Sequence, residues 1–215
     1  MREPSSDGGS LGRGARLRIL AAAHTLFGRQ GMGATSINDL RAQARVSKRT
    51  LYEHFASKDE LLLEYVRQSG LTAAARVLDR EALTPRARLL ELFTALADGP
   101  PPVLNQAAIL AEHQGPDLTR AAIHYPFPDP VLAAAVEFPD AGHPVHQAAG
   151  EQSKRFLERL GELASAAGAD NPERVARRLA LVYAGATARL LLDDPAAVAA
   201  DAHALAALIL RDAID

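Results

Sequence analysis

The chain has 215 residues and no cysteine, which excludes disulfide bonds and thiolate metal sites. Hydrophobic residues make up 48% and charged residues 23%, a balance typical of a globular protein of one or two domains. The sequence has no long uncharged apolar run and no secretion signal at its N-terminus. We therefore expect a cytoplasmic protein with no membrane contact.

The net charge of −2 conceals an uneven distribution of charge. Residues 1–58 carry ten Lys/Arg and four Asp/Glu, whereas residues 59–215 carry fourteen and twenty-two. A basic N-terminal part followed by an acidic remainder predicts a polyanionic partner at one end of the protein. A chance division of solvated charges is the alternative.

The N-terminal residues predict a flexible tail and then a helix. Residues 1–12 are rich in Ser, Gly and Asp, which is typical of a tail. Residues 13–29 carry one apolar stripe at helical spacing, formed by Ile19, Ala22, Ala23, Leu26 and Phe27. Three cations near the helix start oppose its dipole, which favours phosphate contact as their role: Arg13, Arg16 and Arg18.

Two short helices and a capped third follow. Ser36 and Asp39 have the spacing of a capping box, which predicts a helix that starts at this point. Arg45 and Val46 form the expected turn, and Ser47 caps the next helix. A second capping box, Ser57 and Glu60, predicts a long helix that extends to about residue 79.

The helix after Ser47 has two distinct sides. Leu51 and Phe55 face inward, so Arg49, Thr50 and Glu53 lie on the opposite side. Arg49 can bind guanine through two hydrogen bonds, and Thr50 can contact a base edge or a thymine methyl group. Glu53 could accept a hydrogen bond from cytosine, or it could only repel phosphate.

The other candidate DNA contacts suit phosphate groups, which position a helix without reading sequence. They are Thr35, Ser36, Arg45, Ser47, Lys48, Tyr52, His54 and Lys58. The alternative is an ordinary surface helix with a charged face.

These residues resemble the DNA-binding domain of TetR-type transcriptional regulators. The matching positions are Ile19-Leu20, Ala23, Leu26-Phe27, Gly31, Thr35-Ser36, Leu40, Ala44, Val46-Ser47, Thr50-Leu51-Tyr52, Phe55, Lys58 and Leu61-Leu62. The turn departs from the family, which usually has glycine where this chain has Arg45.

The resemblance implies an all-α fold with an N-terminal helix-turn-helix domain, residues 13–57, and a helical ligand-binding and dimerisation domain, residues 58–215. It also implies a homodimer on a palindromic double-stranded DNA operator. The protein would then be a repressor that an unknown small-molecule effector releases from DNA.

Helical patterns continue through the second part of the chain, near residues 85–98, 103–113, 130–137, 144–167, 172–192 and 196–212. The last two have more apolar residues than one buried side needs, so we expect them to form the dimer interface. These residues are Leu179, Leu181, Val182, Ala186, Leu190, Leu205 and Leu208. The alternative is that they only fill the monomer core.

Polar and aromatic residues interrupt the apolar central segment and are candidate effector contacts. They are His113, His124, Phe127, Glu137, His143 and Tyr183. Each could instead be an ordinary core or surface residue. His143 and His146 with Asp140 form only half of a metal site, so no metal or other cofactor is expected.

Two other functions compete with a ligand-responsive regulator. One is a DNA-binding protein without an effector. The other is an enzyme that uses the His-rich central segment, but the sequence contains no nucleophile-elbow, zinc-protease, P-loop or dinucleotide motif. We therefore do not expect an enzyme.

Overall fold

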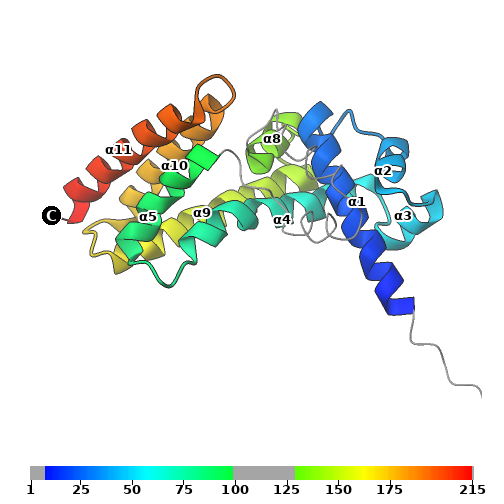
Figure 1. Cartoon of the computed structure of the whole chain (residues 1–215), viewed down its shortest axis with the longest axis horizontal. Coiled ribbons are helices and arrows are strands. Elements are labelled where there is room, and N and C mark those ends of the chain that lie inside the picture. The colour runs from blue at the N-terminus through cyan, green and yellow to red at the C-terminus, as the bar shows by residue number, and fades with distance from the viewer. Residues whose placement is uncertain (1–7, 99–128, 215) are drawn as a thin grey trace, which may run out of the picture. The chain divides into compact units, whose positions relative to one another are not determined.

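The computed structural model describes residues 8–98 and 129–214, and every regular element in these two ranges is a helix (Figure 1). The all-α fold expected from the sequence is confirmed. The expected helix at 103–113 lies outside the described residues. In chain order the helices are α1 (Gly8–Gln30), α2 (Ile37–Ala44), α3 (Lys48–His54), α4 (Lys58–Leu78), α5 (Pro85–Thr94), the 3-10 helix η1 (Ala95–Asp98), α8 (Pro130–Glu137), α9 (Pro144–Ala166), α10 (Pro172–Arg189) and α11 (Pro195–Ile214).

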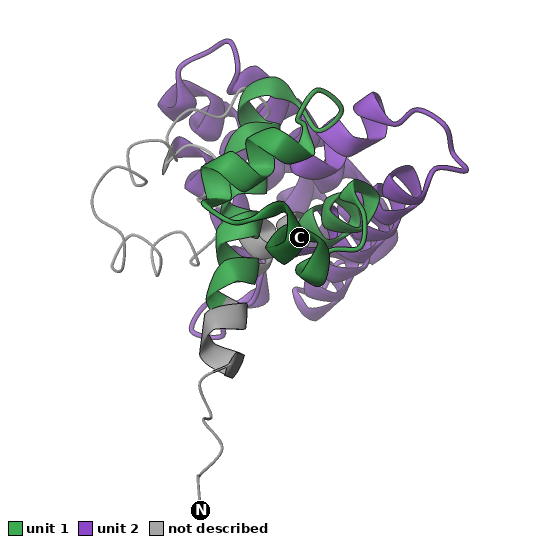
Figure 2. Cartoon of the chain, turned by 90° about the vertical axis from the view of Figure 1, so that its right-hand side faces the viewer, with its two compact units in different colours: residues 1–65, 104–125 green, residues 66–103, 126–215 purple. Residues whose placement is uncertain are grey.

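The described residues fall into two compact units (Figure 2). The first contains residues up to Tyr65, and the second contains Val66 onward. The division therefore falls within α4. None of the helices in the described ranges has an apolar stretch sufficient to cross a bilayer.

In the described part of the first unit, α1, α2, α3 and the start of α4 pack around a small apolar core. The stripe expected on α1 is buried at Ile19 and Phe27, and the Phe27 ring meets the edge of Tyr65 at 5.0 Å between centroids. The other helices add Leu40, Leu51, Phe55, Leu61 and Leu62. This core holds α2 and α3 in place on α1.

Helix α1 begins at Gly8, earlier than the expected start at residue 13, so the end of the predicted tail is helical. Glycine weakens a helix interior, and positions 8, 9 and 12 are glycines. Extending an existing helix costs far less than nucleating one, which permits these extra residues.

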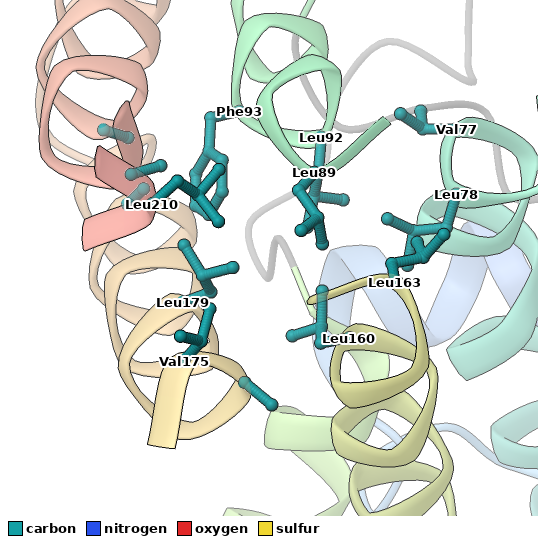
Figure 3. Packing of buried hydrophobic residues seen from close by; sticks show 14 of the residues in the cluster. Val77, Leu78, Leu89, Leu92, Phe93, Leu160, Leu163, Val175, Leu179 and Leu210 are labelled. Carbon is teal, nitrogen blue, oxygen red and sulfur yellow. The ribbon is translucent and has the colours of Figure 1, made fainter. Parts of the chain in front are cut away.

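The second unit has a larger core, to which α5, α9, α10 and α11 each contribute (Figure 3). Its best-buried side chains include Leu89, Phe93, Leu160, Leu179 and Leu210. The unit also buries residues from α4 and η1, among them Leu78 and Leu96.

The last two helices start within one residue of the positions expected from the sequence. The Asn171 side chain accepts a hydrogen bond from the Arg174 amide at 3.0 Å, and Asp194 accepts one from the Ala197 amide at 3.0 Å. A proline occupies the first turn of each helix, where its missing N–H is harmless. Helix α10 ends at Arg189, before the expected residue 192.

Candidate nucleic-acid interface

Helix α2 begins at a complete capping box. The Ser36 hydroxyl accepts a hydrogen bond from the Asp39 amide at 3.1 Å, and Asp39 Oδ2 accepts one from the Ser36 amide at 3.1 Å. Hydrogen bonds from the Ser36 side chain and backbone lower the pKa of Asp39 below its ordinary value. The predicted box is confirmed, and it fixes the direction in which the chain enters α2.

The turn between α2 and α3 passes through Arg45 in the left-handed region, at φ 52° and ψ 49°. The Arg45 amide donates to the Ala42 carbonyl at 3.2 Å, and the Val46 amide donates to the Arg41 carbonyl at 3.0 Å. These bonds end α2 within a tight turn. A residue with a Cβ costs about 1 kcal/mol in this conformation, so the turn has the strain that the sequence raised as a question. The Arg45 side chain is exposed.

Helix α3 is fixed on one side and exposed on the other. Leu51 and Phe55 are buried in the first unit, at 0% and 2% exposure. Ser47 caps the helix, since its hydroxyl accepts from the Thr50 amide at 2.9 Å and shares a 2.8 Å hydrogen bond with the Thr50 hydroxyl. Thr50 therefore retains its methyl group for a base contact, while its hydroxyl already has a partner.

Arg49 and Glu53 form an ion pair on the exposed side of α3, with 2.8 Å between Arg49 Nε and Glu53 Oε1. The hydrogen bond and charge of Glu53 raise the pKa of Arg49. Among the described residues, neither Nη group of Arg49 has a hydrogen-bond partner. These two groups form the edge that suits guanine O6 and N7.

Lys48 and Tyr52 lie next to this pair on α3. The Lys48 ammonium lies 6.0 Å from the centre of the Tyr52 ring, a cation–π arrangement. Tyr52 is 42% exposed, and Lys48 is exposed as well. His54, at the end of the helix, is half-buried. The side chains expected to contact phosphate on α3 thus flank Arg49.

Thr35 and Lys58 make internal contacts that the sequence did not reveal. The Thr35 hydroxyl is buried and donates to the Gly31 carbonyl at 2.7 Å, so its expected side-chain contact with phosphate conflicts with this placement. The Lys58 ammonium donates to the Gly33 carbonyl at 2.9 Å. Both residues brace the segment between α1 and α2.

Two of the cations near the start of α1 also have structural partners. Arg16 pairs with Glu64 at 2.7 Å and lies over the Phe55 ring at 5.3 Å. Arg18 donates to the Ala44 carbonyl at 3.3 Å. Phosphate contact is therefore not needed to explain them. The side chain of Arg13 lies outside the described part of the structure.

The second predicted capping box is only half formed. The Glu60 amide donates to the Ser57 hydroxyl at 3.0 Å, as expected. The Glu60 carboxylate, however, accepts from the Ala56 amide. The reciprocal bond thus reaches one residue further back than the sequence spacing predicted.

The candidate effector contacts in the second unit divide into three groups. His113, His124 and Phe127 lie outside the described residues. His143 caps α9, because its Nδ1 accepts from the Val145 amide at 3.2 Å while its ring stacks on Phe138 at 4.7 Å. Glu137 is half-buried at the end of α8.

Tyr183 is the one candidate in the described residues that packs among the helices of the second unit. Its ring contacts Phe93 at 6.4 Å and Phe156 at 5.2 Å between centroids. Burial and the Asp129 carboxylate raise its pKa. Sequence reasoning missed two neighbouring polar residues, Asp129 and Gln152. Gln152 could have been found because it interrupts an apolar stripe on α9.

A three-helix unit with a tight turn and an exposed basic α3, joined to a separate helical unit, has the architecture of a helix-turn-helix regulator. The model of the bacterial regulatory proteins of the tetR family matches residues 19–65. Residues 19–65 thus match the DNA-binding domain of the TetR family, and the fold of the described residues is similar to solved TetR-family transcriptional regulators.

Individual relatives agree with this assignment. The crystal structure of SCO4454, a TetR-family transcriptional regulator from Streptomyces coelicolor, is 26% identical, with a TM-score of 0.76 over 94% of this chain and 97% of that one. The regulator YjdC of Escherichia coli is 38% identical over 80 residues, which are 37% of this chain and 42% of YjdC. The repressor KstR2 of Rhodococcus jostii is 33% identical over 96 residues, which are 44% of this chain and 47% of KstR2. The match thus spans less than half the length of these two curated relatives.

Proposed function

We propose that the protein regulates transcription by binding double-stranded DNA with α3 in the major groove. The main support for this proposal is that one side of α3 is buried in the core and the other side is exposed. Leu51 and Phe55 fix one side in the core, and Arg49 and Tyr52 are exposed on the other. Arg49 and the Thr50 methyl group are the proposed base readers. Ser36, Arg45, Ser47, Lys48, Tyr52 and His54 are the proposed positioning residues.

The protein would bind DNA as a homodimer through α10 and α11. Leu181 of α10 is 74% exposed, and Leu205 and Leu208 of α11 are about half exposed. The two helices pack on each other, and the Asp170 amide, just before α10, donates to the Ala213 carbonyl near the end of α11 at 3.1 Å. A second copy would cover the exposed leucines in a four-helix bundle.

This interface differs in part from the set expected from sequence. Leu179 and Ala186 are buried in the monomer core, and Val182 and Leu190 are half-buried and pack against it. Only three members of that set, Leu181, Leu205 and Leu208, are exposed enough to meet a partner. A two-fold dimer would then place two α3 helices roughly 34–36 Å apart, which requires a palindromic operator.

We further propose that the protein is a repressor which a small molecule releases from DNA. Some of the curated relatives are named as repressors, which supports the direction of control. The effector would favour a dimer whose α3 helices no longer match successive grooves. The named relatives are regulators, which supports a non-enzymatic role, and a DNA partner supports a cytoplasmic location.

Selection of duplexes from a random library tests this function. The full chain should enrich one sequence with two inverted half-sites about one helical turn apart. The Arg49→Ala variant, selected in parallel, should lose preference at one position of each half-site. Failure of the wild-type chain to enrich any sequence would contradict the proposal.

A further inference from the structure

Gln152 is an uncharged polar residue in the buried stripe of α9. It is 2% exposed and lies one turn from Ala148 and one turn from Phe156. Within the described part of the chain, neither its Nε2 nor its Oε1 has a hydrogen-bond partner. It is the one residue there whose side chain is buried with both polar atoms unsatisfied.

A series of contacts links the face of α9 that carries Gln152 to two other polar groups. Phe156, the next residue on the same face of α9, contacts the ring of Tyr183 from α10. Burial and, to a lesser extent, the charge of Asp129 raise the pKa of Tyr183. Asp129 caps α8, because its carboxylate accepts hydrogen bonds from the Val131 amide at 2.8 Å and the Leu132 amide at 3.3 Å. Three helices of the second unit therefore bring polar groups to one apolar region.

An unsatisfied buried amide is costly. Leaving one buried donor or acceptor without a partner shifts the folding equilibrium on the order of 10- to 100-fold toward the unfolded chain. Methionine has a similar length and would fit an apolar stripe without this cost. A glutamine at this position is therefore better explained by a partner beyond the described residues, and a bound molecule is the partner that we consider here.

The chemistry of these residues limits that partner. A carboxamide offers one acceptor and two donors on a planar edge, which match the C=O and N–H of a primary amide or a lactam. The negative charge of Asp129 would repel an anion, and the two backbone hydrogen bonds that its carboxylate already accepts at the start of α8 make it a poor counter-ion for a cation. Phe156, Ala148 and Phe93 offer apolar contacts for the rest of such a molecule.

We propose that Gln152 and Tyr183 form the hydrogen-bonding end of an effector site for a neutral, mostly apolar molecule with an amide or lactam group. This inference rests on the proposed function as a ligand-responsive regulator. It goes beyond that function because it names the recognition residue and the chemical class of the effector.

Four probes with one apolar chain test the class: decanamide, methyl decanoate, decanoate and decylammonium. Binding to the full-length protein is measured by calorimetry. Decanamide should bind at least ten times more tightly than decanoate or decylammonium, and methyl decanoate, which only accepts hydrogen bonds, should fall between them. Equal affinities, tightest binding by a charged probe, or no binding of decanamide would overturn the assignment.

Two variants test the residue. Gln152→Met should weaken decanamide binding at least tenfold, whereas Gln147→Met, an exposed glutamine on the same helix, should leave it unchanged. Without ligand, Gln152→Met should also raise the melting temperature, since it removes an unsatisfied buried amide. Unchanged binding by Gln152→Met, or a lower melting temperature, would overturn the role of Gln152.

The DNA selection separates this inference from the proposed function. If a palindromic sequence is enriched but decanamide does not bind, the regulator stands and the amide site is wrong. If decanamide binds through Gln152 but no DNA is enriched, the site stands and the proposed function is wrong.

Discussion

Arg49 donates a 2.8 Å hydrogen bond from its Nε to Oε1 of Glu53, one turn further along α3. Because this contact uses Nε, both Nη groups remain without a hydrogen-bond partner among the described residues. We propose that Glu53, whose role the sequence left open, positions Arg49 for DNA. Both side chains are largely exposed, so the pair contributes little to stability, and its consequence is geometric.

Glu53→Gln should separate positioning from simple repulsion. Loss of an acidic group near phosphates should strengthen binding to every duplex. If Glu53 also orients Arg49, preference for the selected operator over a copy with the contacted guanine replaced should fall, by about threefold or more. Fluorescence anisotropy on both duplexes measures this ratio. Stronger binding with an unchanged ratio would mean that Glu53 only repels phosphate.

Arg45→Gly should change DNA binding without a loss of fold stability. Glycine adopts φ 52° without strain, which offsets its greater freedom in the unfolded chain. If Arg45 contacts a phosphate, the slope of log affinity against log salt should become shallower by about 1. Arg45→Lys retains the charge and is the matched control. An unchanged slope and operator affinity in Arg45→Gly would exclude the phosphate contact.

Features that depend on residue spacing within one helix could be predicted from the sequence, whereas contacts between segments could not. The predictable features are the Ser36 capping box, the Ser47 cap and the burial of Leu51 and Phe55. The partners of Thr35 and Lys58 are backbone carbonyls in a neighbouring segment, which no local pattern encodes.

The same limit applies to the second unit. Apolar content predicted that α10 and α11 carry more leucines than one side needs, but Leu179 and Leu181 lie on opposite sides of α10 and only the structure shows which one is buried. Gln152 interrupts an apolar stripe in the sequence, but only the structure shows that its side chain is buried without a hydrogen-bond partner among the described residues.

Leu181→Glu should convert the proposed dimer to a monomer. The residue is 74% exposed, so the change leaves the monomer core intact while placing a charge in the α10–α11 interface. Light scattering should show half the mass of the wild type, and operator binding should weaken with it. Leu132→Glu changes an exposed leucine of α8 and should remain dimeric. A dimeric Leu181→Glu would exclude this interface.

His24 should make the first unit sensitive to acid. Burial lowers its pKa from 6.5 to about 4, so as pH falls the unfolded chain takes up a proton before the folded chain does. Its contribution to stability is complete above about pH 6.5 and is lost as pH falls toward 4, on the order of 3 kcal/mol. His24→Leu should remove this part of the loss in denaturant titrations. The half-exposed His203, changed in the same way, is the control, and an unaltered pH profile in His24→Leu would contradict the assignment.

The central claim is that α3 reads DNA sequence through Arg49. The most direct measurement compares the affinity of wild type and Arg49→Ala for the selected operator and for a shuffled duplex, at one fixed salt concentration. The wild type should prefer the operator by about a thousandfold or more. Arg49→Ala should lose roughly 1–3 kcal/mol on the operator and much less on the shuffled duplex. Equal losses on the two duplexes would show that Arg49 contacts only the backbone and would contradict the account.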